Sequence, residues 1–143
     1  MTSFYLIGSL RNPVVPEVAN TLEKLGFEVF ADWFAAGEIA DDSWQAYETA
    51  RGRTYLEALK GYAANHVFQF DLHHLHRCDG AILVYPAGKS AHLELGYMAG
   101  LGKKTYILLD KYPDRWDVML RFSDGVFIDL ESLIKELLTL KST

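Results

Sequence analysis

The sequence predicts an α/β protein with a single doubly wound, mostly parallel five-stranded sheet and helices on both faces, of the flavodoxin or Rossmann type. Short apolar runs alternate along the chain with longer segments of helical periodicity. Strands that alternate with helices are joined by right-handed crossovers, so that neighbouring strands run parallel. The 143 residues, half of them hydrophobic, suffice to bury the core of one domain, residues 1–143.

Five apolar runs are the candidate strands. The run at residues 81–85 is apolar throughout, which is typical of a strand buried on both faces. Residues 105–109 have the same character, and residues 126–128 form a short last strand. The first two strands are expected at residues 4–7 and 27–30.

Helices are expected between these strands. Val18, Leu22 and Leu25 recur at helical spacing before Gly26, which ends the first helix. The long stretch from residue 41 to 77 lacks strand alternation, and we interpret it as two helices with a break near residues 61–66. A further helix, with Ser90 as its N-cap, is predicted at residues 90–101, and a last one at 130–140.

The composition excludes several classes of protein. A net charge of −5 argues against a surface for polymeric nucleic acid, which usually needs a basic face. The N-terminal apolar run follows no basic residues and is far shorter than the ~20 residues of a membrane span, so we expect neither a signal peptide nor a membrane anchor. The single Cys78 excludes an internal disulfide and fits a reducing compartment. A cytoplasmic protein is expected.

Parallel sheets bind ligands at the carboxyl ends of their strands, so the loops after Ile7, Phe30, Tyr85 and Leu109 are the expected site. Glu94 lies one turn inside the helix after the central strand. The positive end of that helix favours its ionised form, and a fixed carboxylate can attack the anomeric carbon of a sugar. Spacing alone favours the alternative that Glu94 is an exposed, stabilising first-turn glutamate.

Two other motifs do not predict a site. Gly88-Lys89-Ser90 follows a strand like a Walker A loop, but Leu83 occupies the position where that motif needs a glycine. A nucleoside triphosphatase is therefore not expected.

The cluster His73, His74 and His76 follows Asp71, a combination that can ligate zinc. On a helix His73 and His76 share a face while His74 points elsewhere, and no cysteine pair or HExxH motif supports a site. We expect no metal.

The segment LELGYMAGLGKK resembles the ELGYA-type helix of the nucleoside 2-deoxyribosyltransferase family, which includes the deoxynucleoside 5′-monophosphate N-hydrolases. The resemblance spans nearly the whole chain and is weakest over residues 32–66. It implies that Glu94 is the nucleophile. Asp71, eight residues before Asp79 as in the family's D-x7-D pattern, would be the catalytic acid/base or a sugar-positioning group, and Tyr5 would lie near the active site.

The substrate-binding residues follow from the same resemblance. The loop Gly8-Ser9-Leu10-Arg11 is similar to the Gly-Ser-x-Arg loop in which the monophosphate hydrolases hold phosphate, and a guanidinium suits that task. Gly88 replaces the transferases' aspartate, which removes a carboxylate that would repel a 5′-phosphate, and so favours a monophosphate substrate. The hydrolases have a serine there, for which Lys89 or Ser90 would substitute.

Two further segments complete the expected site. Asp117-Val118-Met119 resembles an Asn-x-Met segment that reaches into the neighbouring subunit's active site in the family, although aspartate replaces the asparagine. The resemblance thus implies a homo-oligomer, a dimer or larger, with shared sites. Trp33, after the second strand, either stacks on the base or packs beneath its loop in the core.

Together these residues predict cleavage of the N-glycosidic bond of a 2′-deoxynucleoside or its 5′-monophosphate through a covalent glycosyl–Glu94 intermediate, without a cofactor. The sugar would pass to another base in a deoxyribosyltransferase or to water in an N-hydrolase. Two alternatives stay open: a non-catalytic nucleotide-sensing domain on the same frame, and a glycohydrolase of a larger nucleotide.

Overall fold

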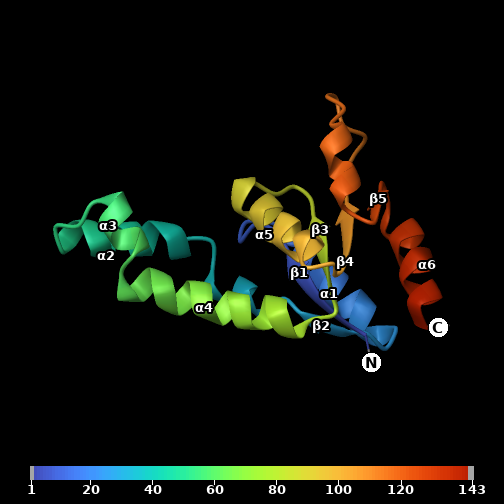
Figure 1. The fold of residues 1–143 in the computed structure, drawn as a ribbon, viewed down its shortest axis with the longest axis horizontal. Helices are drawn as coiled ribbons and strands as arrows, with labels where there is room; N and C mark the ends of the chain where they lie inside the picture. The colour runs from blue at the N-terminus through green and yellow to red at the C-terminus, as the bar shows by residue number, and fades with distance from the viewer. Residues whose placement is uncertain (1, 142–143) are drawn as a thin grey trace.

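The computed structural model describes residues 2–141 and contains one five-stranded sheet, in which all strands are parallel (Figure 1). The strand order β2-β1-β3-β4-β5 reverses direction between β1 and β3. The predicted doubly wound α/β fold is confirmed, and each predicted strand is found within one residue of its expected start and end. The strands are β1 (Ser3–Ile7), β2 (Glu28–Phe30), β3 (Gly80–Val84), β4 (Lys104–Leu108) and β5 (Gly125–Phe127).

Alternation along the central strands divides the core between the two faces of the sheet. Phe4 and Leu6 of β1 point into one cluster, and Tyr5 and Ile7 point into the other. Helices α1 (Val14–Lys24) and α6 (Leu130–Lys141) cover the first face. Helices α4 (Tyr62–Arg77) and α5 (Lys89–Gly100) cover the second, the face on which the candidate catalytic residues lie.

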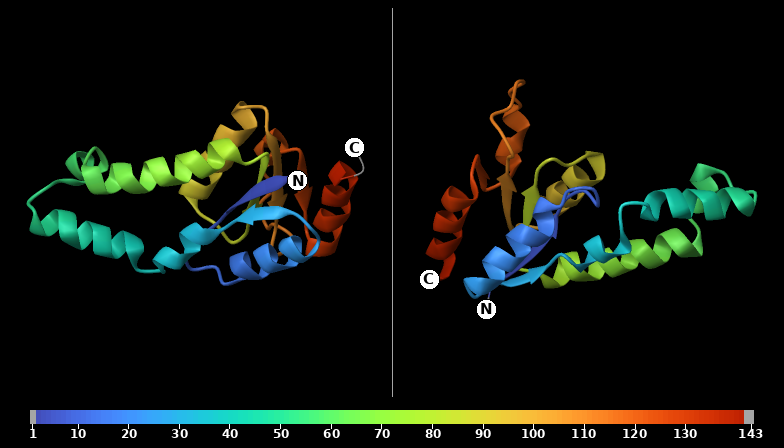
Figure 2. Two further views of the ribbon diagram at one scale, coloured as in Figure 1. Left: turned by 90° about the horizontal axis from the view of Figure 1, so that it is seen from below. Right: turned by 180° about the vertical axis from the view of Figure 1, so that it is seen from behind.

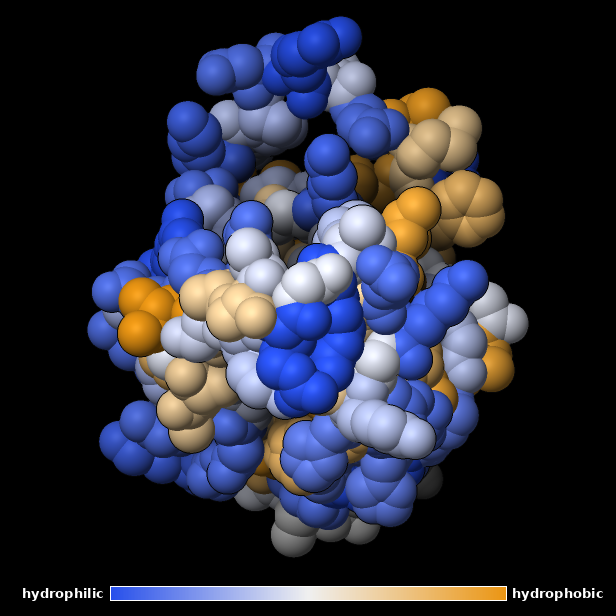
Figure 3. Space-filling model, turned by 90° about the vertical axis from the view of Figure 1, so that its left-hand side faces the viewer, coloured by the Kyte–Doolittle hydropathy of each residue, from blue (hydrophilic) through white to orange (hydrophobic). Residues whose placement is uncertain are grey.

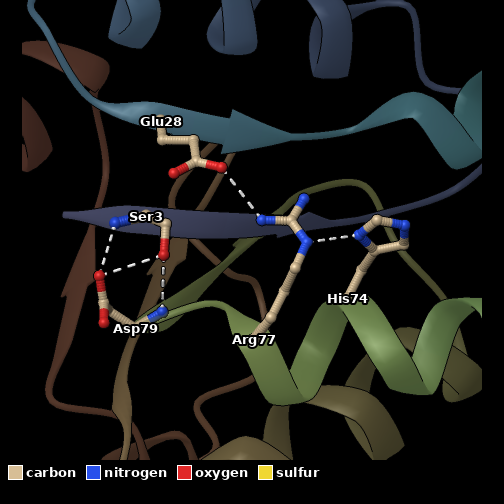
Figure 4. A network of polar contacts seen from close by, with 5 residues as sticks. All are labelled: Ser3, Glu28, His74, Arg77 and Asp79. Atoms are coloured by element: carbon tan, nitrogen blue, oxygen red, sulfur yellow. Dashed lines mark hydrogen bonds and ion pairs between the residues drawn. The ribbon is translucent and has the colours of Figure 1, made fainter. Parts of the chain in front are cut away.

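The pairing of β1 with β3 depends on a glycine and on hydrogen bonds where the two strands begin. A Cβ at Gly80 would lie 2.6 Å from the carbonyl oxygen of Lys104 and 2.9 Å from the Phe4 ring, so only glycine fits there. Beside it, the Ser3 amide and hydroxyl both donate to the Asp79 carboxylate, and the Asp79 amide donates to the Ser3 hydroxyl (Figure 4). Asp79 therefore aligns the two strands.

The carboxyl end of α4 is anchored by two basic residues. The Arg77 guanidinium donates to Glu28 of β2 and to His74 of its own helix (Figure 4). The Lys103 ammonium donates to the carbonyl oxygens of Leu75, His76 and Cys78, which have no partner inside the helix. This end of α4 is thus held while its other end extends past the sheet.

An arm projects from the sheet (Figures 1 and 2), formed by α2 (Ala40–Ala50), α3 (Tyr55–Leu59) and the first half of α4. The prediction of two helices was wrong, because the Thr54 capping box with Glu57 starts a separate short helix α3, and α4 begins at Tyr62 after Gly61. Figure 3 looks onto the end of the arm and shows apolar side chains in separate patches between polar ones.

Short 3-10 helices complete the chain: η1 (Asp32–Ala36) after β2, and η2 (Val118–Phe122) before β5. Among residues 2–141, no helix combines the length and the apolar character that crossing a membrane requires.

Candidate active site

A cleft of about 1200 Å³ opens at the carboxyl ends of β1 and β3, where the strand order reverses. The β1–α1 loop, η1, the start of α5 and the arm helices α2 and α4 form its walls. Nine residues of the predicted site line it: Tyr5, Gly8, Ser9, Arg11, Trp33, Asp71, Gly88, Ser90 and Glu94. The loops after the first, second and third strands, three of the four that were expected, therefore line a cavity, whereas the loop after Leu109 does not reach it.

Three titratable side chains from different elements meet in this cleft. Tyr5 comes from β1, Asp71 from α4 and Glu94 from α5. Burial raises the pKa of Glu94 to about 7, and the negative charge of Asp71 adds to the shift. Burial also raises the pKa of Asp71 above its usual range. Two carboxyl groups in one cleft, of which one raises the pKa of the other, are suited to different roles in catalysis.

The environment of Glu94 differs from both sequence-based expectations. It is the sixth residue of α5, beyond the first turn, and it is half-buried, so the exposed first-turn glutamate is not found. The expected preference for the ionised form is not found either, because burial and the charge of Asp71 raise the pKa of Glu94.

Tyr5 is only 1% exposed, and its ring packs against Phe30 with a centroid distance of 5.3 Å. Burial raises the pKa of Tyr5 far above its usual value, and the charges of Glu94 and Asp71 raise it further. The phenol therefore stays protonated at any working pH. It can donate a hydrogen bond in the cleft but cannot serve as a base.

The β1–α1 loop brings its backbone close to β3. A Cβ at Gly8 would lie 2.9 Å from Val15 Cγ2 and 3.4 Å from the Val84 carbonyl oxygen, so a side chain there would displace the loop. The Ser9 hydroxyl accepts a 3.1 Å hydrogen bond from the Arg11 amide. The Arg11 guanidinium lies 3.9 Å from the Asp42 carboxylate of α2, across the cleft.

Asn12 was missed by the sequence analysis. Its side chain is buried and donates from Nδ2 to the carbonyl oxygens of Val84 (3.4 Å) and Tyr85 (3.1 Å), at the end of β3. Its Oδ1 accepts a 3.1 Å bond from the Val14 amide at the start of α1. The available signal was an asparagine directly before the proline that opens a helix, a position that favours capping side chains.

Trp33 packs in the core and also reaches the cleft. Its indole N–H donates to the Leu6 carbonyl oxygen at 2.7 Å, and its ring packs against the hydrophobic clusters on both faces of the sheet. The same side chain lines the cleft. Trp33 therefore packs in the core, and its stacking on a base stays a prediction.

The start of α5 differs in detail from the prediction. Gly88 precedes the helix and Lys89 is its first residue, so Ser90 is not the N-cap, and no side chain caps this end. Gly88 and Ser90 line the cleft, whereas Lys89 is not among its lining residues.

Asp117 and Met119 lie on a second cavity of about 570 Å³ between α5 and η2, not on the cleft that contains Glu94. The Asp117 carboxylate accepts a 2.9 Å bond from the Met119 amide and so caps η2. His92 lines this second cavity too, where its ring bonds the Tyr85 hydroxyl and the Gly88 carbonyl oxygen. In a single chain these residues do not complete the cleft.

The histidines on α4 take part in packing. His74 stacks on Phe30, and His76 bonds the Tyr97 hydroxyl at 2.6 Å. In the part of the chain that the structure describes, no three His, Cys, Asp or Glu side chains are grouped so as to hold a metal ion.

The arm supplies cleft residues that sequence reasoning did not identify. Side chains of α2 and α4 line the outer half of the cleft, among them Trp44, Tyr47, His66 and Phe70. These residues fall largely in the segment where the family resemblance is weakest, so no motif pointed to them.

Solved structures of the same fold include those of a 2-deoxyribosyltransferase and a CMP N-glycosidase. A 2-deoxyribosyltransferase from Bacillus psychrosaccharolyticus superposes with a TM-score of 0.62 at 17% identity, over 92% of this chain and 90% of the other. The CMP N-glycosidase of Clostridium botulinum superposes with a TM-score of 0.57 at 15% identity, over 95% of this chain and 98% of the other. Neither a family model nor a curated protein sequence matches the chain. The likenesses confirm the fold that the resemblance implies, and at this identity they show the fold alone.

Proposed function

We propose that the protein cleaves the N-glycosidic bond of a 2′-deoxynucleoside or its 5′-monophosphate. The observation that supports this most strongly is the meeting of Tyr5, Asp71 and Glu94 in one cleft at the switch point of the sheet. A binding domain without catalysis has no need of two carboxyl groups whose ionisation is disfavoured by burial. Both structural neighbours, a deoxyribosyltransferase and a CMP N-glycosidase, have names that concern this type of bond.

In this proposal, Asp71 and Glu94 divide the chemistry. Asp71, which is ionised when its charge raises the pKa of Glu94, accepts a hydrogen bond from the sugar and positions it, and the leaving base takes its proton from water while positive charge develops on the sugar ring. The ionised Glu94 carboxylate attacks the anomeric carbon, the bond to the base breaks, and a glycosyl ester forms. Attack by a second base or by water on that ester releases Glu94 again.

Tyr5 and Trp33 position the reactants. The neutral phenol of Tyr5 can donate to the Glu94 carboxylate or to a sugar oxygen, because its proton is retained. Trp33 presents an aromatic surface on the cleft wall, held by its bond to Leu6, on which a base can stack.

We also propose that copies of the chain associate and that Asp117 and Met119 act at a partner's cleft. Both residues lie away from the cleft of their own chain. Around them η2 and the preceding loop expose large apolar side chains, which is typical of an interface. These are Tyr112, Trp116, Val118, Met119 and Phe122.

The test is base release, followed by chromatography, from deoxynucleosides, ribonucleosides, their 5′-monophosphates and dinucleotides. We expect the wild-type protein to release the base from deoxynucleosides or their 5′-monophosphates. The Glu94→Gln variant should release no base, while its circular dichroism spectrum stays that of the wild type. Addition of a second free base separates transfer, which gives a new nucleoside, from hydrolysis. Binding of these compounds without release of any base would instead support the nucleotide-sensing alternative.

A further inference from the structure

Arg11, the expected phosphate ligand, already faces a carboxylate. Its Nη2 lies 3.9 Å from Oδ2 of Asp42, which belongs to the first turn of α2 on the arm. Both side chains are 70% exposed, and both line the cleft. A phosphate bound by the guanidinium would sit next to this carboxylate or would have to displace it.

Some of the backbone donors in the same loop already have partners. The Arg11 amide donates to the Ser9 hydroxyl at 3.1 Å, and the Asn12 amide donates to the Ser9 carbonyl oxygen at 3.0 Å. A phosphate cradle depends on backbone N–H groups that point to the ligand without partners of their own. Two of the amides that would form such a cradle are occupied within the loop itself.

The charge balance of the cleft also opposes an anion. One guanidinium, that of Arg11, stands among six carboxyl groups on the lining residues. Like charges in a cleft with low-dielectric walls repel an incoming anion, and the effect weakens with salt for exposed groups. The carboxyl groups are those of Asp32, Glu38, Asp41, Asp42, Asp71 and Glu94.

From these three observations we infer that the cleft selects an unphosphorylated nucleoside over its 5′-monophosphate, and that Asp42 is a specificity-determining residue that competes with phosphate for Arg11. The inference rests on the proposed function and narrows its substrate class. It runs against the monophosphate substrate that Gly88 led us to expect, because Asp42 on the arm supplies a carboxylate in place of the one missing at Gly88.

The test measures binding by titration calorimetry in the Glu94→Gln background, where a bound substrate is not consumed. A 2′-deoxynucleoside and its 5′-monophosphate with the same base are compared at low salt. We expect a lower Kd for the nucleoside. Adding Asp42→Asn should lower the Kd of the monophosphate about fivefold, the scale of one exposed charge pair, and leave that of the nucleoside within about twofold.

Asp41→Asn is the matched control. Asp41 also lines the cleft in the first turn of α2, yet it forms none of the ion pairs found between residues 2 and 141. The Asp41→Asn substitution removes the same charge without releasing Arg11. Its effect on the Kd of the monophosphate should therefore be clearly smaller than that of Asp42→Asn. Tighter binding of the monophosphate in the Glu94→Gln background, or equal effects of the two substitutions, would overturn the inference. Base release by the wild-type protein tests the proposed function separately.

Discussion

Glu94 and Asp71 belong to helices that pack on the same face of the sheet, and the charge of Asp71 raises the pKa of Glu94. A nucleophilic carboxylate must be ionised, whereas Glu94 has a pKa of about 7 in the empty cleft. Near neutral pH, a large part of the free protein therefore has Glu94 protonated. The pH dependence of the reaction thus reports on this one residue.

We predict that kcat/KM for base release increases as the pH rises through about 7, because kcat/KM follows the ionisation of the free protein. The charge of Asp71 contributes to the raised pKa, so Asp71→Asn should move the midpoint of its residual activity to lower pH. Initial rates between pH 5.5 and 8.5, about 1.5 units on either side of that pKa, measure both effects. A flat profile over this range would contradict the assignment of Glu94.

Glu94→Gln should also change stability in a pH-dependent way. The folded pKa of about 7 lies above the ordinary value of 4.5, so folding disfavours the ionised form. The stability contributed by Glu94 is therefore complete below pH 4.5 and is lost as the pH rises through about 7. In urea denaturation at pH 8, the free energy of unfolding of the variant should be about 1–2 kcal/mol higher than that of the wild type, after allowance for solvent screening. At pH 4 the two proteins should have equal free energies of unfolding. A difference that does not change with pH would exclude the ionisation of Glu94 as its cause.

Among the elements, the β1–α1 loop depends on β3 for its position. Asn12 links the two, with bonds from one buried amide to the end of β3 and to the start of α1. The loop contributes Gly8, Ser9 and Arg11 to the cleft, so a change at Asn12 should reach the site without touching a substrate.

Asn12→Ala should lower the free energy of unfolding by about 1–3 kcal/mol, because it leaves buried backbone groups without partners. It should also lower kcat/KM more through KM than through kcat, since the reacting carboxyl groups lie on other elements. Asn20→Ala, the same substitution at an exposed position of α1, is the control and should change neither quantity. A loss of stability with unchanged KM would mean that Asn12 serves the fold alone.

At the scale of the whole molecule, the fold was predictable and the arm was not. The strands were placed correctly because runs such as residues 81–84 are apolar throughout, which is typical of strands buried on both faces. The arm helices expose much of their apolar surface, as at Leu56, Tyr62 and Phe68, so periodicity there does not mark a core. The raised pKa of Glu94 depends on packing against a separate helix, which no local pattern encodes.

The proposed association predicts complementation between defective chains. Glu94→Gln should be inactive, and Asp117→Ala should be strongly impaired if Asp117 serves a partner's cleft. Refolded together, the two should recover about a quarter of wild-type activity, because half of the dimers are mixed and each mixed dimer has one intact site. Activity equal to the mean of the two variants alone would show that each cleft works within its own chain.

The most direct test of the central claim locates the sugar on the protein. A reaction with a 2′-deoxynucleoside is quenched in acid within the first turnovers, digested with protease and analysed by peptide mass spectrometry. The account predicts a deoxyribosyl ester on the peptide that contains Glu94, and its absence in Glu94→Gln. An ester on the peptide that contains Asp71 instead, or base release by Glu94→Gln at the wild-type rate, would contradict it.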